Sequence, residues 1–102
     1  MNLEEFKQAL TNAQISLTSL PTPLKALYHD KIGNWDAAHE ILEHAIDKNS
    51  AWVHAYLHRK EGDINNARYW YRRSGKPEFQ GELDEECEHI TTQLLLNIKR
   101  VI

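Results

Sequence analysis

Hydrophobic residues recur along the chain at steps of three and four, the spacing of amphipathic α-helices. No segment alternates with a period of two, so we expect no β-sheet. Residues that commonly cap or end helices divide this pattern into six segments. The expected helices cover about 2–14, 23–32, 35–47, 51–61, 64–74 and 82–101. The chain is therefore predicted to be all-α.

Glycines and short polar residues mark the predicted turns. Gly33 and Gly62 are each followed by Asn or Asp, which combines a preferred helix end with the N-cap of the next helix. The segments that begin at these glycines, GNWDAAHEILEHA and GDINNARYWYRRS, align so that Ala38 matches Ala67. Each has small residues on either side of a large one on a single helix face, which resembles the second helix of a tetratricopeptide repeat.

The resemblance implies two helical hairpins, at 23–47 and 51–75, with flanking helices at 1–15 and 82–102. The two segments are 29 residues apart, whereas this family repeats every 34 or so, so we describe the chain as tetratricopeptide-like. The chain also resembles a group of small bacterial proteins that share the runs GNWDAAHE and AWVHAYLHRKEGDINNARYWYRR; this implies a grouping and no activity.

Length, charge and cysteine content narrow the class of protein. The 102 residues have room for one helical domain, over 1–102. A net charge of −3 argues against nucleic acid as a partner, and the absence of a long apolar run argues against a membrane. The single cysteine, Cys87, fits a reducing compartment, so we expect a cytoplasmic protein. Because two hairpins leave helix faces uncovered at their ends, a homodimer is also expected as one way to cover them.

Histidines, arginines and aromatic residues are concentrated between residues 28 and 73. His54 and His58 are four apart, so both rings lie on one side of a helix, and Glu61 continues that side. A divalent metal accepts such a pair, but it needs one or two further ligands from another helix. Hydrogen-bonded or solvent-facing histidines are the alternative interpretation.

Two polar stripes occupy matching positions in the two repeats. The first consists of Asp36, His39 and Glu43; the second, of Asn65, Arg68 and Arg72. If the hairpins stack, Glu43 would pair with an arginine, and His39 would have a carboxylate neighbour and could act as a general base. An ordinary ion pair between helices is the alternative. Segment 59–76 carries about +4 and segment 82–88 carries −5, so we expect the two to neutralise each other, the alternative being a patch that holds an anion.

The leading hypothesis is a non-enzymatic helical-repeat module that holds a peptide or small acidic ligand. The residues assigned to its binding site, called the predicted groove below, are His39, His54, His58, Arg68, Trp70 and Arg72. No catalytic residue and no cofactor are assigned, because no nucleophile, phosphate-loop or dinucleotide motif occurs. The alternative is a small metal-binding protein or enzyme that uses His39, His54 and His58.

Overall fold

A computed structural model describes residues 4–6, 8 and 20–101, and in this part of the chain helices occur without any strand. The all-α prediction is therefore confirmed. Residues 4–6 and 8 are helical, but most of the helix expected at about 2–14 lies outside the described residues. The remaining helices are α2 (Thr22–Lys31), α3 (Trp35–Leu42), α4 (Lys48–Glu61), α5 (Ile64–Ser74) and α6 (Leu83–Val101).

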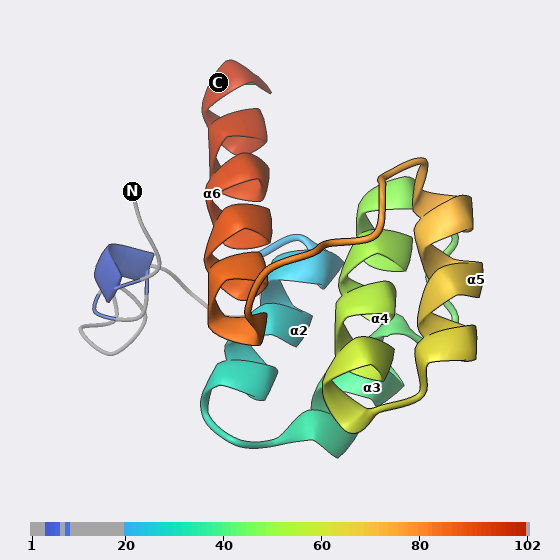
Figure 1. Cartoon of the computed structure of the whole chain (residues 1–102). Helices are drawn as coiled ribbons and strands as arrows, with labels where there is room; N and C mark the ends of the chain where they lie inside the picture. Colours follow the sequence, from blue (N-terminus) through green and yellow to red (C-terminus); the bar gives the residue numbers. More distant parts are fainter. Residues whose placement is uncertain (1–3, 7, 9–19, 102) are drawn as a thin grey trace.

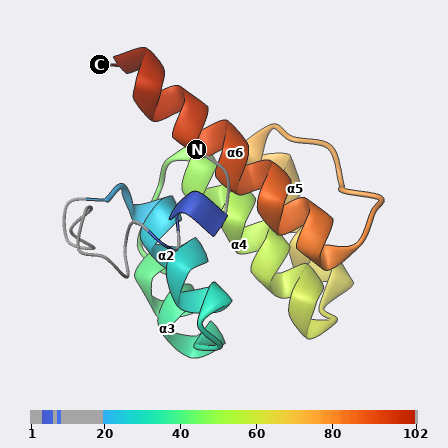
Figure 2. The same cartoon turned by 90° about the vertical axis from the view of Figure 1, so that its left-hand side faces the viewer.

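Helix α4 is the central element of the fold, with α2, α3, α5 and α6 all packed against it. Figure 1 shows α4 and α5 side by side, with α3 next to α4; the C-terminal part of α6 extends past the other helices. Figure 2 shows α6 crossing the α4–α5 pair. Because neighbours surround α4, every side chain from Ser50 to His58 is buried, whatever its polarity. None of the described helices is long and apolar enough to cross a lipid bilayer.

Consecutive helices form the two expected pairs, α2 with α3 and α4 with α5. Ala38 and Ala67 are 0% and 2% exposed, so both alanines face the interior, as the repeat pattern requires. Small side chains at these positions allow α3 and α5 to approach their neighbours closely. The pairing of helices is thus observed, whereas membership of the tetratricopeptide family stays a prediction.

The caps explain why the boundaries of α5 were predicted correctly. Asp63 accepts a hydrogen bond from the backbone N–H of Asn66, which fixes the start of α5. Gly62 has a φ of 91°, a left-handed conformation that favours glycine, and the N–H of Asp63 reaches back to the carbonyl of His58. A single turn therefore ends α4 and begins α5.

The boundary between α3 and α4 was predicted wrongly. Helix α3 ends at Leu42 rather than at about 47, and α4 begins at Lys48 rather than at 51. The apolar spacing continues to Ile46, but the Ile46 side chain is 90% exposed and gains no burial from a longer helix. Asp47 caps α4, because its carboxylate accepts hydrogen bonds from the backbone N–H and the hydroxyl of Ser50. Asp47, expected to be the last residue of the helix at 35–47, thus stabilises the start of α4 instead.

Two buried carboxylates connect α4 to its neighbours. Asp30 on α2 accepts hydrogen bonds from the Tyr56 hydroxyl and the Lys60 ammonium, both at 2.8 Å. On α6, the fully buried Glu86 pairs with Arg59 at 2.9 Å and accepts the Tyr71 hydroxyl. Burial and the Glu86 carboxylate raise the pKa of Tyr71, which keeps its hydroxyl a donor.

These pairs only partly match the expected neutralisation of segment 59–76 by segment 82–88. Arg59 does pair with Glu86 of the acidic segment. Lys60 instead pairs with Asp30 on α2, and Arg68 pairs with Glu78 in the loop before α6. Cys87 is buried as expected of a small packed thiol, and this burial raises its pKa.

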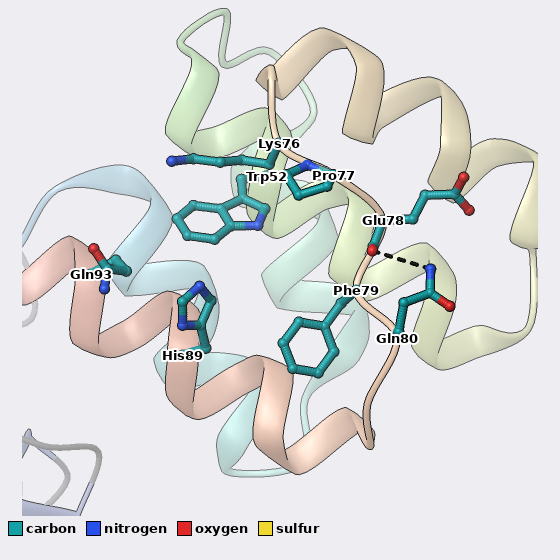
Figure 3. Close-up of a pocket in the computed structure, with 8 residues that line it drawn as sticks. All are labelled: Trp52, Lys76, Pro77, Glu78, Phe79, Gln80, His89 and Gln93. Atoms are coloured by element: carbon teal, nitrogen blue, oxygen red, sulfur yellow. Dashed lines mark hydrogen bonds between the residues drawn. The ribbon is translucent and has the colours of Figure 1, made fainter.

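The loop between α5 and α6 lies beside α4 and borders an open pocket of about 450 Å³, which we call the loop pocket (Figure 3). Three contacts hold this loop: Arg68 with Glu78, Arg59 with the carbonyl of Gly81, and the Lys76 N–H with the Ser74 hydroxyl. The lining residues are Trp52, Lys76, Pro77, Glu78, Phe79, Gln80, His89 and Gln93. The sequence patterns did not indicate this cavity.

Candidate metal centre

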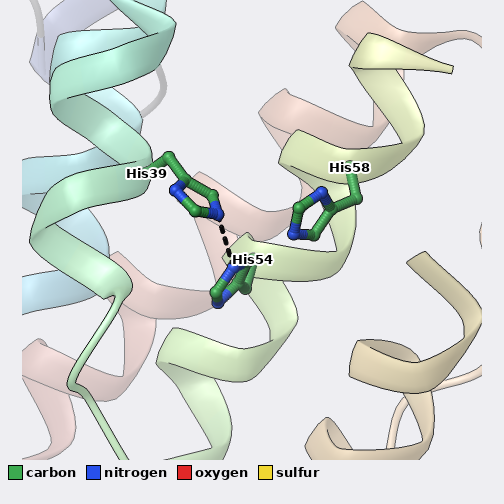
Figure 4. Close-up of side chains that lie close together, drawn as sticks. All are labelled: His39, His54 and His58. Carbon is green, nitrogen blue, oxygen red and sulfur yellow. Dashed lines mark hydrogen bonds between the residues drawn. The ribbon is translucent and has the colours of Figure 1, made fainter. Parts of the chain in front are cut away.

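His39, His54 and His58 converge on one point between α3 and α4, and we call them the histidine cluster. One ring nitrogen from each lies within 4.8 Å of the other two. Figure 4 shows the three rings turned toward one another, His39 from α3 and the other two from successive turns of α4. His54 and His58 are only 4% and 5% exposed, so they do not face solvent. The other form of that interpretation agrees with the structure, because His54 has a hydrogen-bond contact with His39 and His58 has one with Glu61.

The closest contact in the cluster is between His39 and His54. Their Nε2 atoms are 3.0 Å apart, a hydrogen-bond distance, so one of these two nitrogens must carry the shared proton and the other must accept it. Three nitrogens bound to one tetrahedral zinc ion would be about 3.3 Å apart. The observed pair is already near that spacing, and a ring nitrogen of His58 lies within 4.8 Å of both.

Electrostatics favour the neutral form of the central histidine. Burial, together with the positive charges that His58 and His39 would carry, lowers the pKa of His54 from 6.5 to about 3. His54 is therefore an uncharged imidazole at neutral pH. An uncharged imidazole has a nitrogen lone pair available to a metal ion.

A carboxylate orients the third ring. Glu61 Oε1 lies 2.6 Å from Nδ1 of His58, which leaves the Nε2 atom of His58 directed toward the cluster (Figure 4). Metal-binding histidines commonly donate their second ring N–H to a carboxylate, which fixes the tautomer and makes the ligand more basic. The spacing of His58 and Glu61 on one helix side had indicated this pair.

Two tryptophans form the walls of the cluster. Trp70 on α5 stacks on His54 with ring centroids 3.9 Å apart, and Trp35 on α3 stacks on His39 at 5.0 Å. The indole N–H of Trp35 donates to the carbonyl of Leu57 at 3.0 Å, which fixes that ring against α4. The two indoles therefore restrict the rotation of the His54 and His39 rings before any ligand arrives.

The other residues of the predicted groove lie elsewhere. Trp70 joins the histidine cluster, but Arg68 is exposed and pairs with Glu78, and Arg72 is exposed on α5. Within the described residues, Glu43 forms no ion pair with an arginine, and no hydrogen bond joins His39 to Asp36 or Glu43. The two polar stripes therefore do not meet as the repeat alignment suggested.

A second group of possible ligands adjoins the first and shares His58. Ligand atoms of His58, Glu61 and Asp63 lie within 4.8 Å of one another, but both carboxylates are exposed. Asp63 also caps α5, which occupies one of its oxygens. We therefore regard the histidine cluster as the better candidate.

Comparison with known proteins gives this site no precedent. No family model matches the chain, and no significant match was found among curated proteins or among solved structures. The functional argument consequently depends on the geometry of the described residues.

Proposed function

We propose that this protein is a small helical metal-binding protein in which His39, His54 and His58 ligate a divalent transition metal. The observation that carries the proposal is the convergence of three imidazole nitrogens within 4.8 Å inside the fold. Buried polar groups ordinarily have partners of fixed geometry. The polar contacts of these three rings are instead mainly with one another, apart from the contact of His58 with Glu61.

The donor set indicates the class of metal. Imidazole nitrogens suit Zn²⁺, Cu²⁺ and Ni²⁺, whereas Ca²⁺ and Mg²⁺ prefer several oxygen ligands. Three protein ligands leave a fourth tetrahedral position for water or another small ligand. Imidazole ligands bind a metal as neutral groups, so the carboxylate of Glu61 would supply the nearest negative charge to balance the cation. The site thus suits metal binding, and the proposal assigns no reaction to it.

The hypothesis of an interaction module stays a prediction, with fewer residues available to contact a partner. Trp70, His54 and His58 are packed together, so they are not free to line an open groove. The exposed arginines of α5 could still contact an acidic partner. Cytoplasmic location also stays a prediction, supported by a single buried thiol in place of a disulfide.

The proposal is tested by titrating untagged, chelator-treated protein with Zn²⁺ in a calorimeter. His39→Gln, His54→Gln and His58→Gln each remove one ligand and retain a polar side chain. His44→Gln is the matched control, because His44 is exposed and lies outside the cluster. Native mass spectrometry of the same samples gives the number of ions per chain.

We expect one Zn²⁺ per chain and an affinity at least tenfold lower in each cluster variant than in the His44 control. Circular dichroism of every variant without metal shows whether the helices persist. Equal Zn²⁺ affinity for the wild-type protein and all three cluster variants would contradict the proposal, as would the absence of binding to the folded wild-type protein.

A further inference from the structure

The loop pocket has the composition of a second binding site, independent of the histidine cluster. Its volume of about 450 Å³ lies within the usual range for small-molecule sites, roughly 300–1,000 Å³. Trp52, Pro77 and Phe79 give it an apolar surface, and polar side chains from the loop and α6 surround that surface (Figure 3). Such sites combine a mainly apolar lining with a few placed polar groups.

Several hydrogen-bond donors around this pocket have no partner. Among the described residues, the indole N–H of Trp52, the ammonium of Lys76 and the amide of Gln93 form no hydrogen bond. Trp52 is only 5% exposed, yet it lines the cavity. A largely buried indole N–H usually has an acceptor. The indole nitrogen of Trp52 is not fully enclosed by protein, so solvent or a ligand in the pocket can supply that acceptor.

The charges near the pocket favour an anion. Lys76 lies over the Trp52 ring, with the ammonium 4.6 Å from the ring centroid, and it forms no ion pair with a described residue. The acidic group of the lining, Glu78, pairs with Arg68 at 3.0 Å. One uncompensated cation therefore remains, beside neutral donors from Trp52 and Gln93.

The aromatic side chains favour a flat ligand. The rings of Trp52 and His89 are nearly perpendicular with centroids 5.8 Å apart, and Phe79 lies 6.1 Å from His89. Figure 3 shows Lys76, His89 and Gln93 around the Trp52 ring, with Phe79 on the loop side. Faces and edges arranged in this way stack on planar rings. Arg59 and Arg68 contact the loop at two points, the carbonyl of Gly81 and the carboxylate of Glu78.

We propose that the loop pocket binds a small monocarboxylate with a planar aromatic body. The carboxylate pairs with the Lys76 ammonium and accepts the indole N–H of Trp52 or the amide of Gln93. The flat body lies among Trp52, His89 and Phe79. A single unpaired cation matches the single charge of a carboxylate better than the double charge of a phosphate monoester.

The test uses naphthoate as the probe and naphthamide as its uncharged counterpart. Each is titrated into a solution of ¹⁵N-labelled wild-type protein with added chelator, so that the histidine cluster is metal-free in every sample. The indole N–H signal of Trp52, assigned with Trp52→Phe, reports on the pocket. Lys76→Met removes the charge and keeps the apolar stem, and Lys25→Met is the control because Lys25 does not line the pocket.

We expect naphthoate to shift the Trp52 signal saturably, and Lys76→Met to raise the Kd about tenfold while Lys25→Met leaves it unchanged. Three results would overturn the proposal: an unmoved Trp52 signal, equal affinity for naphthamide, or tighter binding of naphthyl phosphate. The Zn²⁺ titration is a separate experiment on different residues, so each proposal can fail without the other.

Discussion

Two groups of buried polar side chains lie against α4, and they differ in how completely they are satisfied. Around Glu86, the carboxylate has a guanidinium from Arg59 and a hydroxyl from Tyr71, so charge and hydrogen bonds are balanced within the fold. In the histidine cluster, His39 and His54 share one hydrogen bond and no carboxylate. The first arrangement is complete as a structural link, whereas the second has lone-pair nitrogens directed at one another.

The difference indicates what each group contributes. A buried ion pair joins α4 to α6, and the protein loses stability when either partner is removed. The positive charges that His39 and His58 would carry lower the pKa of His54, and imidazole nitrogens that face one another attract a metal cation. We infer that the Glu86 network serves the fold and that the histidine cluster serves binding.

The largest expected effect is on the satisfied network. Glu86→Gln leaves the half-buried guanidinium of Arg59 without its counter-ion, and we expect the free energy of unfolding to fall by about 3 kcal/mol. Urea denaturation measures it, with Glu88→Gln, an exposed neighbour on α6, as the control. Equal effects of the two substitutions would show that the network does not support the fold.

Acid should destabilise the metal-free protein through His54. The pKa of His54 is about 3 in the fold and 6.5 in the unfolded chain, so the unfolded chain binds more protons between these values. Stability is therefore complete above pH 6.5 and is lost as the pH falls toward 3. Between about pH 7.5 and about pH 5, we expect a loss of about 2 kcal/mol from this group. The measurement is urea denaturation at both pH values.

His54→Gln removes the titrating ring, so its stability should vary less over the same pH interval. The pH-dependent differences, rather than the absolute stabilities, are compared, because the substitution also changes packing against Trp70. An identical pH dependence in the two proteins would mean that His54 titrates normally and is not the neutral ligand described above.

A smaller effect is expected from the carboxylate behind His58. Glu61→Gln removes the charge that fixes the His58 ring, and we expect Zn²⁺ affinity to fall about tenfold, as is typical of groups that orient metal ligands. Calorimetry measures it, with Glu40→Gln on the exposed side of α3 as the control. Unchanged Zn²⁺ affinity would show that Glu61 does not contribute to metal binding and that only the three imidazoles do.

The smallest effect is expected for a surface ion pair. Arg68 and Glu78 are both about half exposed, so solvent screens their attraction. Glu78→Gln should change the free energy of unfolding by less than about 0.5 kcal/mol in urea denaturation. A loss as large as that of Glu86→Gln would contradict the view that burial separates the two kinds of pair.

Local chemistry made much of the fold predictable. Asp63, Gly62 and Gly75 act through hydrogen bonds a few residues away, so the sequence alone placed α5 correctly. The end of α3 was missed because apolar spacing at Ile46 indicates only that a helix could continue. Whether it does continue depends on a neighbour that would cover Ile46, and no local pattern contains that information.

The candidate site was predictable to a similar extent. Spacing placed His54 and His58 on one side of α4, and the alternative hypothesis of a metal site or enzyme grouped His39 with them. Their burial was missed because it results from four helices packing around α4, which is a property of the whole fold. The position of Arg68 was missed because a loop carboxylate, Glu78, competes for it.

The most direct test of the central claim is X-ray absorption at the zinc edge, on untagged protein loaded with one equivalent of Zn²⁺. We predict three imidazole nitrogens at about 2.0–2.1 Å and one exchangeable oxygen ligand from water. The same spectrum of His54→Gln should lose an imidazole contribution. A wild-type spectrum with oxygen ligands and one imidazole or none would contradict the assignment of His39, His54 and His58 as a metal centre.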